Sequence, residues 1–163
     1  MNIFLVADTH FNHCNIIKYC KRPFYDVFDM NNTIIEKWNE VVSKDDIVYH
    51  LGDFGFGSLE ELKNIFDRLN GKKNLIMGNH DYKYGEVFFK KIGFEIVEKK
   101  EIKINNIIFT HFPKHIDKNY INIYGHIHEK PISKKFDDDR HFCICLEKTN
   151  YYPIKLDDLI NKE

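Results

Sequence analysis

Five short polar blocks in this chain each stand directly after a run of apolar residues. A short, continuous apolar run is typical of a buried strand, and such a strand delivers the next polar residue to the rim of its sheet. Five strands of this kind can gather their polar ends at one place in the fold. Seven residues in the blocks have side chains that bind hard or borderline metal ions: Asp8, His10, Asp53, Asn79, His111, His126 and His128. The blocks therefore predict a site for two metal ions where the strands end.

The first half of the chain alternates strand and helix patterns. Strands are expected at 3–7, 47–51 and 74–77, with amphipathic helices between them at 31–42 and 58–69. Strands separated by helices pair in parallel, because the helix carries the chain back to the starting edge of the sheet. Neither a linker nor a shift in composition marks a boundary, so residues 1–163 are expected to form a single domain.

The second half changes to a pattern of hairpins. Apolar segments at 94–104 and 107–112 flank Asn105-Asn106, which is a strong two-residue hairpin signal. Hairpins imply antiparallel pairing, so we expect a mixed sheet system with helices outside it. Shorter elements complete the pattern: helices before Arg22 and at 86–92, strands at 121–124 and 141–146, and a last helix after 153–156.

Charge gives no overall attraction to nucleic acid or to an anionic membrane. The chain has 24 basic and 25 acidic residues and a formal net charge of -1. Paired lysines are scattered along it and are typical of a solvated surface: Lys72–Lys73, Lys90–Lys91, Lys99–Lys100 and Lys134–Lys135. Nucleic acid is therefore a possible partner, but the charge of the chain does not support it.

Nothing in the sequence is typical of export or of membrane insertion. The apolar opening at 1–7 is too short for a signal-peptide core and has no basic leader. No stretch approaches the roughly 20 apolar residues that a membrane span needs. The four cysteines show neither zinc-finger nor C-x-x-C spacing and are expected to be reduced. These features predict a cytoplasmic protein with no membrane partner.

The blocks resemble the five motifs of the calcineurin-like metallophosphoesterases. The matching segments occur in the family's order between residues 8 and 128: Asp8-x-His10, Gly52-Asp53, Gly78-Asn79-His80-Asp81, His111 and Gly125-His126-x-His128. The resemblance implies an α/β fold with two packed mixed β-sheets flanked by helices, an αββα sandwich of four layers.

The resemblance also implies a division of the ligands between two divalent metal ions. Asp8, His10 and His128 would hold one ion, and Asn79, His111 and His126 would hold the other. Asp53 would bridge them, since a carboxylate can share its charge between two dications. The ligands mix imidazole with oxygen and include no thiolate, which favours Mn, Fe, Zn, Ni or Co, with manganese first.

By the same resemblance, two ions about 3.5–4 Å apart would generate a hydroxide that attacks phosphorus in line. Asp53 and the non-ligand His80 would be the catalytic residues, with His80 acting as an acid or charge stabiliser. Asp81 would lie behind the ligands and hold the ring of His80 in place. Within a compact subgroup of the family, His13, Asn12 and Arg22 are candidates for substrate contact.

One position departs from the family pattern. Many relatives carry Asp or Asn three residues after the bridging aspartate, where this chain has Phe56. The departure puts a hydrogen bond from that position in doubt and leaves the ligands unaffected. Of the other histidines, His50 is expected in the core or behind the ligands, and His115 and His141 at the surface.

Several functions stay open at this point. We expect hydrolysis of a phosphodiester, with a phosphorylated small molecule or a nucleotide as the substrate. The alternatives are a phosphomonoesterase acting on a nucleotide or a phosphoprotein, a nuclease, and a scaffold that has lost catalysis. A scaffold is expected to lack ligands, and here none is missing.

Overall fold

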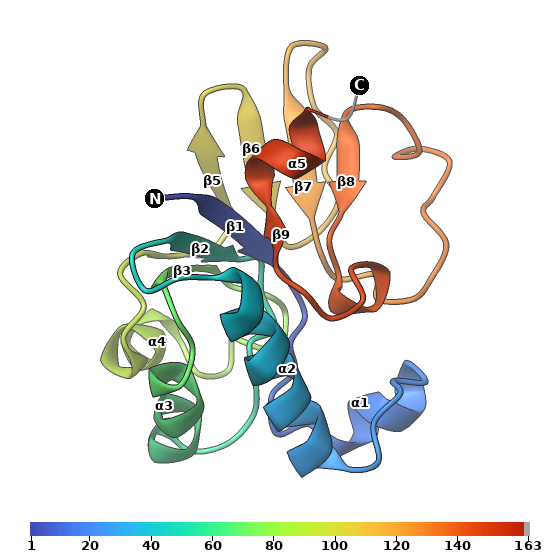
Figure 1. Ribbon diagram of the computed structural model, residues 1–163. Coiled ribbons are helices and arrows are strands. Elements are labelled where there is room, and N and C mark those ends of the chain that lie inside the picture. Colours follow the sequence, from blue (N-terminus) through green and yellow to red (C-terminus); the bar gives the residue numbers. More distant parts are fainter. Residues whose placement is uncertain (162–163) are drawn as a thin grey trace.

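The structure is a computed structural model that describes residues 1–161 (Figure 1). Its strands form a five-stranded sheet, in the order β4-β3-β2-β1-β9, and a four-stranded sheet, in the order β5-β6-β7-β8. The strands are β1 (Ile3–Val6), β2 (Ile47–His50), β3 (Lys72–Ile76), β4 (Val97–Glu98), β5 (Glu101–Ile104), β6 (Ile107–Thr110), β7 (Ile121–Tyr124), β8 (His141–Cys143) and β9 (Ile154–Lys155). The helices are α1 (Cys14–Tyr19), α2 (Val27–Val41), α3 (Leu59–Asp67), α4 (Glu86–Ile92) and α5 (Leu156–Ile160), with a short 3-10 helix at Leu146–Lys148.

Alternate residues of β1 belong to two different cores. Phe4 and Val6 face a cluster that also contains the apolar sides of α2, α3 and α4. Leu5 and Ala7 face a second cluster, which is shared with β6, β7 and α5. This alternation places the five-stranded sheet between a layer of helices and the second sheet (Figure 1). The two packed mixed sheets with helices confirm the expected fold class.

Pairing in the first sheet agrees with the sequence pattern. β1, β2, β3 and β4 are mutually parallel, and β9 joins the edge of β1 in the antiparallel direction. Ser58 caps α3 through the capping box with Glu61.

Phe136 packs near both His115 and His141. His115 is exposed, as expected, but His141 is buried, so the prediction of a surface position for His141 was wrong.

Pairing in the second sheet differs in part from the expectation. β5 and β6 form the antiparallel hairpin around Asn105-Asn106, as predicted. The pairs β6–β7 and β7–β8 are parallel, so the prediction of antiparallel pairing was wrong there. Long loops at 113–120 and 125–140 return the chain to the starting edge, which is what parallel pairing requires.

The segment expected as one strand at 94–104 is divided between the two sheets. β4 pairs with β3 in the first sheet, and β5 pairs with β6 in the second. Lys99 and Lys100 lie at the crossing between them. The chain therefore passes from one sheet to the other at a pair of lysines.

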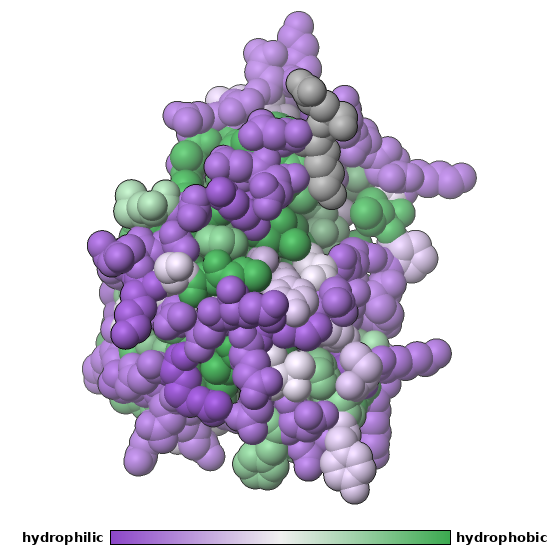
Figure 2. Space-filling model, in the orientation of Figure 1, coloured by the Kyte–Doolittle hydropathy of each residue, from purple (hydrophilic) through white to green (hydrophobic). Residues whose placement is uncertain are grey.

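Hydrophilic residues cover most of the face seen in Figure 2, and hydrophobic residues show between them in smaller patches. Within residues 1–161, no helix combines the length and the apolar character that crossing a membrane takes.

Candidate metal centre

The polar blocks come together at one edge of the two packed sheets. Among the described residues, three groups of side chains have ligand atoms that all lie within 4.8 Å of one another, and two of these groups consist of residues from the polar blocks; the third contains Cys20, His128 and Glu147. The first group, which we call group one, contains Asp8, His10 and His128. The second, group two, contains Asp53, His111 and His126. The structure thus brings together six of the seven residues that the blocks predicted as ligands.

Asn79 joins group two through its amide oxygen. Its Oδ1 lies 3.0 Å from Nε2 of His111. The seventh residue of the blocks therefore lies beside the second group, as the resemblance implied.

Asp53 lies between the two groups. Its Oδ2 is 3.5 Å from Nε2 of His10, in group one, and 3.4 Å from Nε2 of His111, in group two. A single carboxylate oxygen thus faces one histidine of each group. A carboxylate in this position could be shared by two cations.

Three histidine rings are oriented by contacts through Nδ1. His111 Nδ1 lies 2.7 Å from the carbonyl oxygen of Leu51, and His128 Nδ1 lies 3.0 Å from Oε1 of Glu147. Nδ1 of His10 is 3.0 Å from Nδ1 of His13. Because carbonyl and carboxylate oxygens only accept, His111 and His128 carry their proton on Nδ1. When these rings are neutral, the free electron pair is therefore on Nε2, the nitrogen that faces the centre and that a metal ion would take.

The backbone at these blocks is held in an unusual conformation. Five of the seven predicted ligands have positive φ angles although none is glycine, namely Asp8 (60°), His10 (50°), Asp53 (58°), His126 (72°) and His128 (52°). Such conformations cost about 1–3 kcal/mol each and persist where the surrounding structure enforces them, often at functional sites. The fold therefore stabilises strained backbone in order to turn these side chains inward.

Glycines allow the blocks to approach one another closely. A Cβ atom at Gly78 would lie 2.2 Å from Oδ1 of Asp53, and one at Gly125 would lie 2.5 Å from Oδ2 of Asp8. Any larger residue would displace the carboxylates, so Gly78 and Gly125 leave the space in which those side chains lie.

Unpaired polar atoms at the centre fit bound cations. Oδ1 of Asp8 and Nε2 of His10 are buried, and neither has a hydrogen-bond partner among the described residues. Leaving buried polar atoms unpaired is costly. A divalent cation in group one would satisfy both atoms, and the imidazole and carboxylate donors suit a transition metal. The residues present therefore fit the metal ions that the sequence pattern predicts.

The charges of Asp53 and His111 depend on each other, and a metal ion would compete with protons for them. Burial works against ionisation of Asp53, but the imidazoles of His10 and His111 hold the pKa of its carboxyl well below the usual range. Burial also opposes protonation of His111, yet Asp53 and Asp8 raise its pKa to about 9. Protons and metal ions thus compete for the same nitrogen, so metal binding releases protons.

Asp81 connects two of the ligand turns. It is fully buried and accepts hydrogen bonds from the backbone N–H groups of Gly78 (2.8 Å), Asp53 (2.7 Å) and Phe54 (3.1 Å). It lies behind the ligands, but the hydrogen bonds of its carboxylate within residues 1–161 go to these amides and not to the ring of His80. Asp81 therefore positions Asp53 itself.

His50 and Thr9 connect the turns after β1 and β2. Nδ1 of the fully buried His50 accepts the Gly52 N–H at 3.1 Å, so the ring proton is on Nε2, which lies 2.9 Å from Oγ1 of Thr9. The Thr9 hydroxyl donates to the Phe54 carbonyl at 2.6 Å. Burial lowers the pKa of His50 to about 3, so the ring is neutral. The expectation that His50 lies in the core agrees with this position.

Arg22 lies behind the centre and not at its mouth. Its side chain is buried and donates to the backbone carbonyls of Thr9 (2.9 Å) and Asp8 (2.6 Å) and to Glu147 (2.9 Å). These bonds hold the turn that carries Asp8 and His10. The placement does not support the expected contact between Arg22 and a substrate, because protein groups already occupy the guanidinium.

Asn12 and His13 also contact protein groups. The amide of Asn12 donates to the carbonyl of Phe56 (3.0 Å) and accepts from Asn31 (2.8 Å), which fixes the loop after His10. His13 is half-buried, and its ring lies against Phe56 with 4.4 Å between centroids. Through Nδ1 it orients His10, so it contributes to the centre even where it does not touch a substrate.

His80 stands at the open side of the centre. Its side chain is exposed, and its backbone N–H donates to Oδ1 of Asp53 at 3.0 Å. The ring lies 5.4 Å from the ring of His10 and 5.4 Å from that of Phe56, centroid to centroid. It is therefore held beside both groups without being part of either.

Glu147 is a residue of the centre that the sequence patterns did not identify. Its buried carboxylate pairs with both His128 (3.0 Å) and Arg22 (2.8 Å). Burial opposes its ionisation, but His128 and Arg22 lower the pKa of Glu147 to about 2. The available signal was its place just after the strand expected at 141–146, like the five blocks after theirs.

We expect Glu147→Gln to weaken binding of the ion at group one by roughly 10- to 100-fold, a usual effect of removing an orienting carboxylate. The amide can still accept one hydrogen bond, but it supplies no charge to His128 or Arg22. Isothermal titration of the metal-stripped protein with Mn²⁺ measures the change, and circular dichroism establishes that the variant is folded. Glu36→Gln, on the exposed side of α2, is the matched control. Equal affinity in a folded Glu147→Gln protein would contradict the assigned role.

Comparisons with known proteins identify a matching family and several relatives. A sequence model of the calcineurin-like phosphoesterase superfamily domain matches residues 1–143. An uncharacterised protein of Methanocaldococcus jannaschii is 38% identical over 169 residues, covering 97% of this chain and 89% of that protein. The gene 66 protein of Mycobacterium phage L5 is 37% identical over 84 residues, covering 49% of this chain and 40% of the phage protein.

Two solved structures have a similar fold. A protein of unknown function from Aquifex aeolicus superposes with a TM-score of 0.74 at 27% identity and covers 97% of each chain. Nuclease MPE of Pseudomonas putida gives a TM-score of 0.54 at 19% identity, covering 77% of this chain and 61% of the nuclease. At that identity the second likeness shows the fold alone.

Proposed function

This chain belongs to the calcineurin-like phosphoesterase superfamily, and on that premise we propose that it hydrolyses a phosphodiester with two divalent metal ions. The observation that carries the proposal is the position of Asp53. Its Oδ2 lies at 3.5 Å and 3.4 Å from Nε2 of His10 and His111, one from each group. A carboxylate in that position can hold two cations together.

The ligands would be divided as the two groups are. Asp8, His10 and His128 would hold one ion, Asn79, His111 and His126 the other, and Asp53 both. When bound, the ions would supply positive charge to the phosphoryl oxygens and make a water acidic enough to attack phosphorus near neutral pH.

His80 would act on the substrate itself. Its exposed ring lies at the mouth of the centre, and the hydrogen bond from its backbone to Asp53 keeps it there. From this position Nε2 or Nδ1 could donate a proton to the leaving oxygen, or stabilise charge on a phosphoryl oxygen. Phe56 packs beside the ring and limits its movement.

The burial of Arg22 favours a diester over a monoester. A monoester carries an additional negative charge, which arginine is well suited to bind. Arg22 is buried and already bound to Glu147 and to two backbone carbonyls. It therefore supplies no free guanidinium for a terminal phosphate.

The test is a metal-screened assay of the purified, stripped protein. It compares bis-nitrophenyl phosphate, nitrophenyl phosphate and cyclic nucleotides after addition of Mn, Fe, Zn, Ni or Co. We expect activity to be absent in chelator and to return with metal, with manganese the most effective, and the diester to be preferred by at least about tenfold. Preference for the monoester would reverse the substrate assignment. Failure to bind any of the metals would remove the basis of the proposal.

A further inference from the structure

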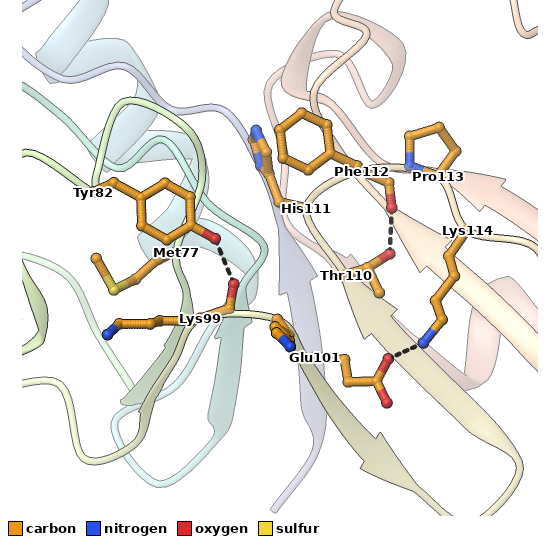
Figure 3. Close-up of a pocket in the computed structure, with 10 residues that line it drawn as sticks. Met77, Tyr82, Lys99, Glu101, Thr110, His111, Phe112, Pro113 and Lys114 are labelled. Atoms are coloured by element: carbon orange, nitrogen blue, oxygen red, sulfur yellow. Dashed lines mark hydrogen bonds and ion pairs between the residues drawn. The ribbon is translucent and has the colours of Figure 1, made fainter.

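A pocket opens directly beside group two. It has a volume of about 330 Å³ and is lined in part by His111, Tyr82 and Phe112. Figure 3 shows the His111 ring at one end of the pocket, with Lys114 and Glu101 at the other. The pocket lies where the chain crosses between the sheets at Lys99 and Lys100, and it shares the His111 wall with the metal centre.

Two half-exposed aromatic rings flank this pocket. Tyr82 is 46% exposed and Phe112 is 44% exposed, although large aromatic side chains are usually more buried. The hydroxyl of Tyr82 donates to the carbonyl of Lys99 at 2.7 Å, which fixes the ring. Phe112 packs against His111 (4.9 Å) and His126 (4.4 Å), centroid to centroid. The rings therefore offer fixed apolar faces next to group two.

Positive charge surrounds the same pocket. Lys99, Lys100 and Lys114 contribute to its lining, against one acidic residue, Glu101. Glu101 pairs with Lys114 and, at 3.2 Å, with Lys103, which lies outside the lining. Lys99 pairs at 3.2 Å with Glu86, also outside the lining, so Lys100 is the lining lysine that forms no ion pair among the described residues. Positive side chains beside aromatic faces are the combination with which proteins bind single-stranded nucleic acid.

We infer that this pocket binds the nucleoside next to the scissile phosphate, so that the substrate is a single-stranded oligonucleotide. The base would lie against Tyr82 and Phe112, and the following phosphate near Lys99, Lys100 and Lys114. The inference rests on the proposed function for the phosphate at the metal centre. The chain's overall charge of -1 does not oppose it, because the lysines act locally.

The test measures binding in metal-free protein, so it does not depend on hydrolysis. ¹⁵N-labelled protein is titrated with trithymidylate, with an abasic trimer of the same phosphates, and with inorganic phosphate. We expect the backbone amides of Tyr82, Lys100 and Phe112 to shift with trithymidylate. We also expect trithymidylate to bind more tightly than the abasic trimer, since stacking contributes about 1–3 kcal/mol per base.

Two variants separate the base from the phosphate. Phe112→Ala is expected to weaken the binding of trithymidylate at least about fivefold and to leave the binding of the abasic trimer little changed. The double variant Lys99→Ala/Lys100→Ala is expected to weaken the binding of both trimers. It should also reduce the slope of log binding constant against log salt concentration by roughly 0.7 per lysine removed. Lys134→Ala/Lys135→Ala, an exposed lysine pair of the same composition, is the matched control.

The outcomes distinguish this inference from the proposed function. Equal binding of trithymidylate and the abasic trimer, or full competition by inorganic phosphate, would show an anion site and overturn the inference. Absence of binding in a protein that hydrolyses bis-nitrophenyl phosphate would overturn it and leave the function standing. Pocket shifts in a protein that hydrolyses no diester would support the pocket and remove the function.

Discussion

Asp53→Asn is expected to lower kcat/KM for a small phosphodiester by at least about 10³-fold. Removing a single preorganised electrostatic contact to a transition state typically costs about 10²–10³ in kcat, and this substitution affects both cations. Asn retains the shape of the side chain and can still accept the His80 N–H at Oδ1, which is 3.0 Å away in the native protein. In that orientation an amide nitrogen replaces Oδ2, so the change removes both the charge and the oxygen that faces the two groups, while it keeps the shape of the side chain.

Kinetics and metal content together test the role of Asp53. We expect two metal ions per native chain and one or none in the variant, measured by mass spectrometry of the purified proteins. Asp45→Asn, an exposed aspartate that is distant from the blocks in sequence, controls for the loss of one surface charge. A variant that keeps two tightly bound ions and native activity would show that Asp53 does not bridge.

For an alkyl phosphodiester, His80→Ala is expected to lower kcat by about 10²- to 10⁴-fold, the usual contribution of a positioned acid or base. The metal content should stay at two, because the His80 ring belongs to neither group. The side chain is exposed, so we expect little change in the free energy of unfolding. This combination of lost activity with retained metal separates His80 from the ligands.

The leaving group identifies what His80 does. If it protonates the leaving oxygen, the loss should be large for an alkyl ester and small for a nitrophenyl ester, whose leaving group needs no proton. His115→Ala, an exposed histidine on the loop at 113–120, is the control. An equal loss with both esters would assign His80 to stabilising phosphoryl charge, and loss of a metal ion would make it a ligand.

The first sheet could be predicted from local sequence patterns, and there is a physical reason for this. Strands alternating with amphipathic helices leave few arrangements other than a parallel sheet. The second sheet was less predictable, because the loops at 113–120 and 125–140 have no secondary structure of their own. Nothing in their sequence shows that they return β7 and β8 to a parallel pairing.

Residues that support the centre depend on contacts between distant parts of the chain. Arg22 and Glu147 are 125 residues apart, yet their side chains pair at 2.8 Å. An arginine in a polar loop is a reasonable candidate for phosphate binding when only its neighbours in sequence are known. In the folded chain Arg22 is buried against Glu147 and the backbone carbonyls of Asp8 and Thr9, so its partners are structural instead.

The sequence by itself determined which seven side chains gather at the centre, because each follows a strand and strand ends share one edge of a sheet. Only the tertiary structure decided which atoms face one another, with Asp53 Oδ2 between His10 and His111. It also placed Lys99 and Lys100 at the lip of a pocket where the pattern indicated plain solvated surface. Strand ends are set by local periodicity, whereas burial and pairing depend on contacts that no local pattern encodes.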